Sequence, residues 1–362
     1  MSILSKEYSL DPLNIPKEKL ERDVIVLGIE STSHTFGVGL VELHNGRVRL
    51  LANALSQYKP TRGGIHPRES FLHHVSSAQS VLKQAFEASG LDISRVNAIA
   101  VAVGPGLGPC LRVGASLARF LASYYRKPIA PVNHAVAHIE IGKLVSGFGD
   151  PVIVYVSGGN TMILVQRGRK YNVVGETLDI PLGNLLDTFA REVGIAPPYV
   201  VGGKHAIDIC AEWSSEYIPL PYTVKGCDLS FSGLLTAALR IARQSLGDKE
   251  KLGAVCRSLR EVAFNMLVEV TERTLMLTNK KSILLVGGVA SNTELRRKFE
   301  AVTEHYGVEF YGTPPEVAGD NGLMIAYTGL LHYLYGILRE PKEVFVKQRY
   351  RLDEDEYPWL PP

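Results

Sequence analysis

Cysteine is scarce in this sequence, and its spacing offers no recognisable site. Only four cysteines occur among 362 residues, and no two of them form a CxxC pair. This spacing speaks against a disulfide framework, a zinc ribbon and a thioredoxin-like motif. A reducing, cytosolic compartment is therefore the default expectation.

Long apolar runs and an excess of one charge are also missing. No uninterrupted apolar run approaches the roughly 20 residues of a membrane-spanning helix, and residues 1–23 lack the apolar stretch of a signal peptide. Lysine and arginine total 39 against 37 aspartates and glutamates, which gives a formal net charge of +2. We expect a soluble, cytoplasmic protein without a membrane partner, whose RNA-binding surface, if present, is local.

What is present is a pattern of strands and helices that occurs twice. The first series predicts helices at 71–90, 112–125 and from 134, with strands at 23–30, 36–43, 47–55, 96–104 and 128–133. The second predicts helices at 184–193, 232–246, 252–279, 292–306 and from 321, with strands at 151–160, 161–167, 171–178, 282–290 and 308–313. Two βββαβα units predict an α/β protein of two lobes that face a cleft, with two unrelated α/β domains as the alternative.

The same pattern predicts the boundaries of the domains. Residues 1–23 carry charge and two prolines without a sustained period, which indicates an extension outside the fold. Residues 24–149 form the first lobe and residues 150–339 the second. Residues 340–362, with an acidic run and a Pro-Trp-Leu-Pro-Pro end, form a C-terminal surface strap.

Two histidines at helical spacing are the strongest metal-ligating pattern. His134 and His138 form H-A-V-A-H directly after a predicted strand, and the i, i+4 spacing puts both imidazoles on one helix face. The zincin motif HExxH is absent, since Ala135 follows the first histidine. Asp320, in G-D-N-G at a helix start, is the best acidic third ligand. Half-buried histidines and a simple helix cap are the alternatives.

Two glycine turns follow predicted strands and allow a backbone to approach a phosphate. One is Y-V-S-G-G-N at residues 155–160, and the other is V-G-G-V-A-S-N at residues 286–292. Asn292, at a cap position, could instead bond a purine or ribose. A plain hairpin turn would look the same as the first turn, and no Walker motif is present, because G-P-G-L-G-P is not followed by Gly-Lys-Ser/Thr.

Two further features of the sequence fit either a functional or a purely structural role. Asp187, in G-N-L-L-D-T-F, lies on an amphipathic helix, where a lone carboxylate is usually solvated. Arg62 precedes G-G-I-H-P-R-E at residues 63–69, and Arg68 lies within it; together they make a compact basic loop that fits a phosphate backbone or a partner protein. A solvated loop is the alternative.

Taken together, eight ordered strings resemble the universal tRNA N6-threonylcarbamoyladenosine transferase family over about residues 24–350. The strings are GIESTSHTFGVGL, GGIHPRESFLHH, GPGLGPCLRVG, NHAVAH, VYVSGGNT, KGCDLSFSGLLTAA, LLVGGVASN and GDNGLMIAY. The second and sixth resemble the archaeal and eukaryotic branch, the catalytic subunit of the KEOPS complex, formerly labelled an O-sialoglycoprotein endopeptidase.

The resemblance implies an actin/Hsp70/hexokinase-like fold and an acyl-type transfer. The threonylcarbamoyl group would pass from threonylcarbamoyl-AMP to N6 of the adenosine 3′ of the anticodon in tRNA. It further implies a separate synthase that supplies the adenylate, and KEOPS partners comprising a small kinase/ATPase, a dimerisation subunit and an accessory subunit. Two alternatives remain, a metallopeptidase and an ATP-dependent chaperone or kinase of the same fold.

The family's site residues are carried over only where this sequence matches its motifs. The implied metal is divalent, with iron preferred to zinc, and its ligands match His134, His138, Tyr155 and Asp320. ATP, ADP and AMP are expected to fit the same cleft as the adenylate. The adenylate-binding positions match Tyr155, Val156, Ser157, Gly158, Gly159, Asp187, Gly203, Asp208 and Asn292.

One segment departs from the family pattern. The family's G-G-P-x-hydrophobic-E becomes G-G-K-H-A-I-D here, one residue longer, so Asp208 would replace the ribose-binding glutamate with a shorter reach. Gly319 also replaces the usual threonine before the metal aspartate.

Overall fold

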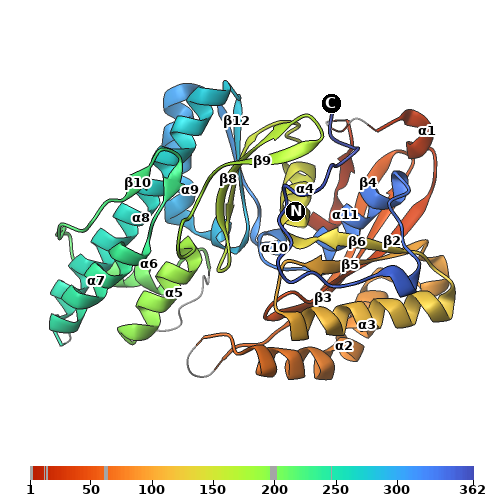
Figure 1. Cartoon of the computed structure of the whole chain (residues 1–362), viewed down its shortest axis with the longest axis horizontal. Coiled ribbons are helices and arrows are strands. Elements are labelled where there is room, and N and C mark those ends of the chain that lie inside the picture. The colour runs from red at the N-terminus through yellow and green to blue at the C-terminus, as the bar shows by residue number, and fades with distance from the viewer. Residues whose placement is uncertain (1–2, 12, 14, 61–63, 196–201, 246) are drawn as a thin grey trace. The chain divides into compact units, whose positions relative to one another are not determined.

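The structure is a computed structural model that describes residues 3–11, 13, 15–60, 64–195, 202–245 and 247–362. The chain divides into two compact units, each with its own sheet (Figure 1). Unit 1 comprises Met1–Gly149, Arg167–Lys170 and Asp320–Pro362, and unit 2 comprises Asp150–Gln166 and Tyr171–Gly319.

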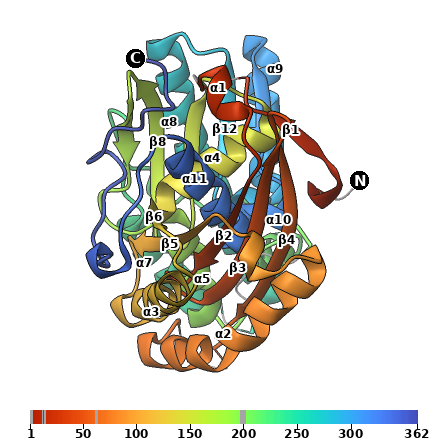
Figure 2. The same cartoon turned by 90° about the vertical axis from the view of Figure 1, so that its right-hand side faces the viewer.

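Unit 1 is built on a six-stranded sheet in the order β1-β4-β3-β2-β5-β6. The strands are β1 (Glu7–Ser9), β2 (Val24–Glu30), β3 (Thr35–His44), β4 (Arg47–Gln57), β5 (Ala98–Gly104) and β6 (Ile129–Asn133). The α-helices are α1 (Lys17–Leu20), α2 (Pro67–Ser89), α3 (Gly108–Tyr125), α4 (His134–Ser146) and α11 (Gly322–Leu334). Figures 1 and 2 show α2 and α3 on one face of this sheet and α11 with α4 on the other.

The burial of each strand follows from this layering. Every residue of β2 and β5 is buried, because helices cover both faces of the sheet there, and both strands accordingly read as continuous apolar runs. In β4, residues alternate between buried and more exposed over most of its length, as expected where one face meets solvent.

Helix α11 lies directly against the sheet because glycines remove the intervening side chains. A Cβ on Gly322 would stand 2.1 Å from the backbone nitrogen of Gly39, and a Cβ on Gly39 would stand 2.3 Å from that of Leu323. Nothing larger than glycine fits at either position without moving the helix. This backbone contact fixes the start of α11, and with it the place of Asp320.

Unit 2 is built on a five-stranded sheet in the order β13-β12-β7-β8-β9. Its strands are β7 (Val152–Val156), β8 (Thr161–Arg167), β9 (Lys170–Glu176), β12 (Ser282–Val286) and β13 (Glu309–Gly312), with a separate hairpin of β10 (Val224–Lys225) and β11 (Asp228–Leu229). Its α-helices are α5 (Leu182–Glu192), α6 (Ala206–Ala211), α7 (Ser232–Gln244), α8 (Lys249–Thr278), α9 (Thr293–Tyr306) and α10 (Pro315–Ala318).

The two sheets share one strand order. Counted along the chain from β2 and from β7, five strands of each sheet run 3-2-1-4-5, with the first, fourth and fifth parallel. This repetition confirms the predicted α/β class and the duplicated βββαβα unit.

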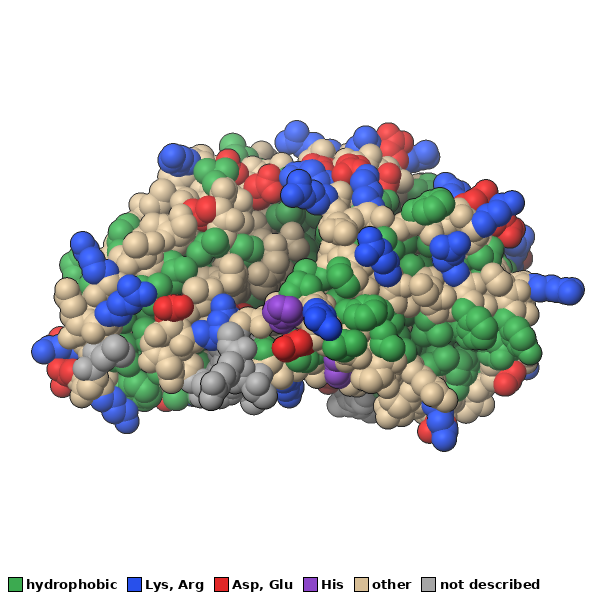
Figure 3. Space-filling model, turned by 60° about the horizontal axis from the view of Figure 1, so that its bottom comes forward, with side chains coloured by type: hydrophobic (Ala, Val, Ile, Leu, Met, Phe, Trp, Pro, Cys, Tyr) green, Lys and Arg blue, Asp and Glu red, His purple; other side chains and the backbone are tan. Residues whose placement is uncertain are grey.

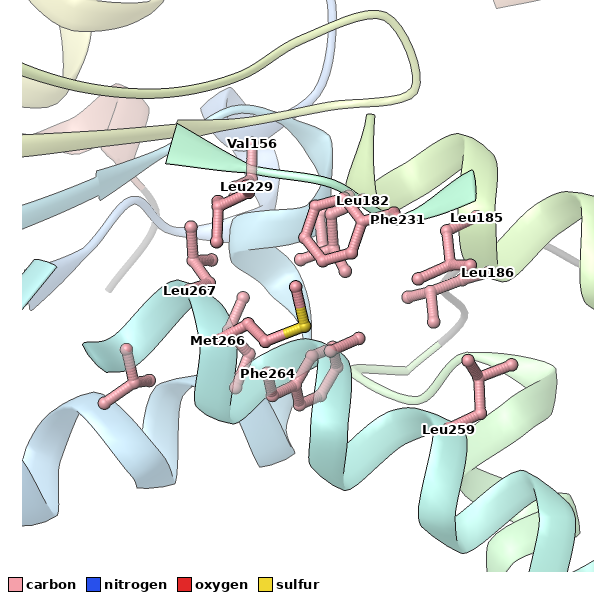
Figure 4. Packing of buried hydrophobic residues seen from close by; sticks show 14 of the residues in the cluster. Val156, Leu182, Leu185, Leu186, Leu229, Phe231, Leu259, Phe264, Met266 and Leu267 are labelled. Carbon is pink, nitrogen blue, oxygen red and sulfur yellow. The ribbon is translucent and has the colours of Figure 1, made fainter. Parts of the chain in front are cut away.

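The buried apolar side chains of unit 2 hold together the strands and helices that carry its predicted nucleotide-binding residues. In Figure 4, side chains from α5 and α8 point toward one another and toward Val156 at the end of β7; they are Leu182, Leu185 and Leu186 of α5, and Leu259, Phe264, Met266 and Leu267 of α8. The full burial of Val156 and Leu182 fixes the end of β7 and the start of α5 in one place.

Both ends of the chain are more integrated in unit 1 than the sequence suggested. Residues 1–23 were expected to lie outside the fold, yet β1 pairs antiparallel with β4, and Leu10 is buried. At the other end, Trp359 is fully buried, and its indole nitrogen donates to Oε1 of Glu140 at 2.8 Å. Three-residue strands and isolated anchors carry no period, so sequence patterning misses them.

The prediction that the cysteines form no disulfide is wrong for one pair. Cys210 of α6 and Cys256 of α8 are 46 residues apart, but α6 packs on α8 and the two residues form a disulfide with a Cα–Cα distance of 5.8 Å. Cys110 and Cys227 are free. Sequence spacing cannot show such a pairing, because tertiary packing decides it. The expectation of a reducing compartment therefore loses its support.

A buried histidine on α11 should make unit 1 sensitive to acid. Burial lowers the pKa of His332 to about 4, whereas an imidazole in the unfolded chain titrates near 6.5. Below about pH 6.5 the unfolded chain therefore binds a proton that the folded chain does not, so the free energy of unfolding falls as the pH is lowered. At pH 4.5 the loss amounts to about 2.5 kcal/mol.

The variant His332→Leu tests this expectation, because leucine cannot titrate. Chemical denaturation at pH 7.5 and at pH 4.5 should show a smaller drop in unfolding free energy for the variant than for the wild type. An equal drop in both proteins would show that His332 does not cause the acid sensitivity.

Candidate functional site

Two imidazoles and one carboxylate converge at the starts of two helices in unit 1. Helix α4 begins at His134 because the Asn133 side chain caps it, accepting from the backbone N–H of Ala135 at 3.0 Å. One turn of helix then places His138 beside His134. Asp320 stands directly before Asn321, the N-cap of α11, so its carboxylate is not used for capping. The alternative that Asp320 is only a helix cap is therefore wrong.

The distances within this group suit a metal ion. Oδ1 of Asp320 lies 3.3 Å from Nε2 of His138 and 3.5 Å from Nε2 of His134. One ligand atom from each residue lies within 4.8 Å of the other two. Imidazole nitrogen together with carboxylate oxygen is a donor set for iron, zinc and related divalent metals. These residues therefore fit the ion that the sequence predicts.

The buried glutamate Glu30 is hydrogen-bonded to His134 on the Nδ1 side of the ring. Oε2 of Glu30, at the end of β2, lies 2.9 Å from Nδ1 of His134. The other carboxylate oxygen accepts from the backbone N–H of Thr32 at 2.6 Å and from its hydroxyl at 2.5 Å. Because the carboxylate takes up Nδ1–H, it directs Nε2 of His134 toward Asp320. Metal-binding histidines are commonly oriented in this way by a carboxylate.

The charges in this group favour a cationic partner. Burial alone would lower the pKa of His134, but the charge and hydrogen bond of Glu30, with Asp320, raise it to about 9. Burial lowers the pKa of His138, against the opposing effect of Asp320. Burial would raise the pKa of Asp320, yet its hydrogen bond to His138 and the charge of His134 hold it below the usual range. The Asp320 carboxylate thus stays ionised beside the two imidazoles.

Unit 2 gathers the sequence-predicted nucleotide residues at one edge of its sheet. Strands β7 and β12 pair in parallel, so their glycine turns lie side by side at the carboxyl ends of the strands, where α/β proteins bind ligands. Gly287 has φ +92°, and a Cβ there would stand 2.3 Å from the carbonyl oxygen of Val156. Gly287 is therefore required for the two turns to meet.

The turn after β7 leaves room for a ligand. Gly158 and Gly159 are exposed, and nothing lies within 4 Å of the place where a Cβ of either would stand. The Ser157 hydroxyl oxygen accepts from the backbone N–H of Gly159 at 3.2 Å and of Asn160 at 3.0 Å, which holds the turn in shape. An open, shaped turn of this kind can receive a phosphate.

Asn292 and Asp208 are hydrogen-bonded to each other and to helix ends. The Asn292 side chain caps α9 through its oxygen and donates its Nδ2–H to Oδ2 of Asp208 at 2.7 Å. That oxygen also accepts from the backbone N–H of His205 at 2.7 Å. Burial raises the pKa of Asp208, against the effects of His205, Asn292 and Arg260, whose guanidinium lies 3.7 Å from Oδ1. Asp208 is only 1% exposed.

The neighbouring carboxylate, Asp187 on α5, is more accessible. Its side chain is 24% exposed, and Oδ1 lies 2.9 Å from Nε2 of His205. Gly203, at φ +81°, accepts through its carbonyl from the backbone N–H of Thr293 at 2.8 Å. Asp187, His205, Asp208 and Asn292 are therefore linked by a series of hydrogen bonds, and Gly203 is bonded to Thr293, the residue that follows Asn292.

The remaining predicted residues lie elsewhere. Tyr155 is buried in β7, with Asn160 Nδ2 3.4 Å from its hydroxyl, and its assignment as a further metal contact stays a prediction. Arg68 is exposed in the first turn of α2, whereas Arg62 lies outside the described residues.

Sequence reasoning missed two residues that shape these groups. Glu30 follows an apolar strand like any turn residue, and its contact with His134 spans 104 positions. His205 occupies the segment with the extra residue, and that departure from the family pattern was the available signal.

Comparisons with known proteins show which family the sequence resembles. A sequence model of the family described as "TsaD: tRNA N6-adenosine threonylcarbamoyltransferase" matches residues 49–327. A protein of Staphylothermus marinus named tRNA N6-adenosine threonylcarbamoyltransferase is 64% identical over 92% of this chain and 99% of its own. One of the same name from Hyperthermus butylicus is 55% identical over 94% of this chain and 93% of its own.

Solved structures show the same fold at low sequence identity. HypF of T. kodakarensis matches with a TM-score of 0.58 and 15% identity over 87% of this chain, which spans about half of that protein (48%). Component A of the (R)-2-hydroxyglutaryl-CoA dehydratase of Acidaminococcus fermentans matches with a TM-score of 0.50 and 13% identity, over 85% of this chain and 98% of its own. Among the described residues, no helix combines the length and apolar character needed to cross a membrane.

Proposed function

Because the chain belongs to the tRNA N6-adenosine threonylcarbamoyltransferase family, we propose that it transfers the threonylcarbamoyl group from threonylcarbamoyl-AMP to N6 of the adenosine 3′ of the anticodon in tRNA. The amine nitrogen forms a bond to the carbamoyl carbon, AMP leaves with the electrons of the broken bond to its phosphate, and the amine loses a proton. The observation that carries the proposal is the 64% identity to a named transferase over nearly the whole chain.

We propose that His134, His138 and Asp320 hold one divalent metal, iron in preference to zinc. Support comes from their donor atoms, which lie within 4.8 Å of one another, and from Glu30, which orients His134. A metal bound there would supply Lewis-acid polarisation of a carbonyl or phosphoryl oxygen. The role of Glu30 is to keep Nδ1 of His134 engaged, so that Nε2 faces the other two ligands.

We propose that the adenylate is held by unit 2, and that ATP, ADP and AMP also bind there. The open Ser157–Gly159 turn offers backbone groups to a phosphate, and Asp187 offers a carboxylate to sugar hydroxyls. Holding the phosphate and sugar fixes the position of the carbonyl that the amine attacks. No protein nucleophile is required, because AMP is a good leaving group.

The chain is further proposed to work with KEOPS subunits in the cytoplasm, where tRNA and a separate adenylate synthase supply its substrates. A protein partner is supported by the surface of α2 and α3, where Figure 3 shows hydrophobic side chains gathered. The large exposed ones on these helices are Leu72, Val75, Phe120, Tyr124 and Tyr125. Such a patch on a protein surface is typical of an interaction site.

Arg68 is proposed to contact the tRNA backbone, and Arg62, which lies outside the described residues, is proposed to contact the tRNA or a partner. The variant Arg68→Gln should weaken tRNA binding several-fold at low salt, and its plot of log affinity against log salt should be shallower by about one unit, because one phosphate contact releases about one counterion. Arg95→Gln, which removes another exposed arginine of unit 1, is the control. An unchanged slope for Arg68→Gln would mean that this arginine does not touch the RNA.

Mass spectrometry of tRNA nucleosides tests the proposed reaction. Unmodified tRNA is incubated with the chain, the partner subunits, a separate adenylate-forming enzyme, threonine, bicarbonate and ATP. Threonylcarbamoyladenosine should form only when the chain is present. If instead the chain cleaves denatured or glycosylated proteins in a metal-dependent way that His138→Ala removes, and forms no modified nucleoside, the metallopeptidase alternative is correct.

A further inference from the structure

The extra residue in the segment G-G-K-H-A-I-D places a histidine ring against the accessible carboxylate of unit 2. We propose that His205 is a positioning residue that holds Asp187 in the orientation needed to accept hydrogen bonds from the ribose hydroxyls of an adenine nucleotide. The inference rests on the proposed nucleotide site.

The hydrogen bonds of His205 fix which ring nitrogen carries the proton. Nδ1 lies 3.1 Å from the backbone nitrogen of Ile207 and accepts its N–H, so Nδ1 carries no proton. A neutral imidazole then has its proton on Nε2. Nε2 lies 2.9 Å from Oδ1 of Asp187, and therefore donates to it. One ring thus caps helix α6 on one side and holds a carboxylate on the other.

His205 is more deeply buried than Asp187, as a positioning role for His205 requires. His205 is 2% exposed, so its ring is held inside unit 2, whereas the side chain of Asp187 is 24% exposed. Among the described residues, Asp187 is hydrogen-bonded through Oδ1, which leaves Oδ2 for a donor from outside. Asp208, the residue expected to bind the ribose, is 1% exposed and already accepts two hydrogen bonds through Oδ2. The accessible carboxylate is therefore Asp187.

The position of the His205 ring is itself fixed on both sides. Its backbone N–H donates to Asp208, which completes a capping box at the start of α6, and Asp208 is held by Asn292. The carbonyl of Gly203 accepts from Thr293 at the start of α9. The ring itself is held at Nδ1 by the N–H of Ile207, whereas the Asp187 side chain is partly exposed, so the ring sets the orientation of the carboxylate.

Two substitutions of His205 separate its role as the cap of α6 from its hydrogen bond to Asp187. In His205→Asn, the side-chain oxygen stands near the place of Nδ1 and keeps the helix cap, but nothing reaches Asp187. In His205→Gln, the side-chain amide nitrogen stands near the place of Nε2 and can still donate to Asp187, while the cap is lost. The pair is matched, since each variant keeps one hydrogen bond and loses the other.

Calorimetric titration with AMP and with 2′,3′-dideoxy-AMP is the test. His205→Asn should bind AMP about tenfold more weakly than the wild type, because hydrogen bonds to a charged group of this kind have about that effect. His205→Gln should bind AMP nearly as well as the wild type. The dideoxy nucleotide, which lacks both ribose hydroxyls, should bind the wild type and His205→Asn equally. In an Asp187→Ala background, His205→Asn should have no further effect.

Other outcomes would overturn the proposal. If His205→Asn binds AMP like the wild type, or if its effect adds to that of Asp187→Ala, His205 does not act through Asp187. If His205→Gln is the weaker binder, the ring serves only as a cap. These results would leave the nucleotide site itself intact, whereas a wild type that binds no AMP would overturn that site together with the inference.

Discussion

His138→Ala and Asp320→Ala are expected to abolish threonylcarbamoyl transfer while the protein stays folded. Each removes one of three donors from a site where all ligand atoms lie within 4.8 Å of one another, and two remaining donors hold a divalent metal poorly. The fold should survive, because Asn321 and not Asp320 caps α11, and alanine is a good helix former in place of His138 on α4.

Two measurements belong to this prediction. Elemental analysis of the purified variants should show metal content well below one per chain, and nucleoside mass spectrometry should show no product. The control is His44→Ala, which removes a histidine of unit 1 that pairs with Asp23 on the surface and should leave metal and activity unchanged. A folded Asp320→Ala that keeps both its metal and its activity would remove Asp320 from the site.

Glu30→Ala should lower metal affinity by about 10- to 100-fold, the usual effect of removing a carboxylate that orients a metal-binding histidine. The carboxylate of Glu30 is fully buried and lies 2.9 Å from Nδ1 of His134. The Thr32 hydroxyl lies 3.2 Å from the same nitrogen, but it is neutral and cannot replace the charge of the carboxylate. Without Glu30, the ring of His134 loses its charged partner, and the N–H and hydroxyl of Thr32 lose their acceptor. Competition with a coloured chelator measures the affinity without any need for turnover.

Glu30→Gln is the matched variant for this effect. Its amide oxygen can still accept from Thr32, so the turn after β2 should keep its shape, but the negative charge beside His134 is gone. Metal affinity should fall between the values for the wild type and for Glu30→Ala. If Glu30→Ala binds metal as tightly as the wild type, His134 is oriented by another group.

Local sequence patterns predicted those parts of the molecule that depend on near neighbours in the chain. The two series of apolar runs predicted the duplicated unit, because each strand and helix carries its own period. H-A-V-A-H predicted two imidazoles on one face, because helix geometry alone fixes that spacing. The glycine turns were found because few residues besides glycine allow such approach, as the contact of Gly287 with Val156 shows.

What the sequence could not show depends on contacts between distant residues. The pairing of Glu30 with His134 arises only when β2 and β6 lie in one sheet, on either side of β5. The Cys210–Cys256 disulfide depends on the packing of α6 on α8. The segment at residues 1–23 looked unstructured because β1 is only three residues long and is stabilised by its pairing with β4.

The burial of Asp208 could not be foreseen from the sequence, and its assignment to the ribose stays a prediction. Its match to the family's ribose-binding glutamate was made by residue type and position, with one extra residue in the segment. Asp208 instead lies inside unit 2, between the Asn292 side chain and the start of α6. Residue type alone does not tell an internal carboxylate from an accessible one, since that difference is set by burial.

Transfer to tRNA is proposed to require a metal held by His134, His138 and Asp320. The most direct test is the amount of threonylcarbamoyladenosine formed by metal-stripped wild type, with partners and substrates present, before and after a divalent metal is returned. We predict no product from the stripped protein, restored product once iron or zinc is added, and none from Asp320→Ala under either condition. Full product formation by the stripped protein would contradict the account.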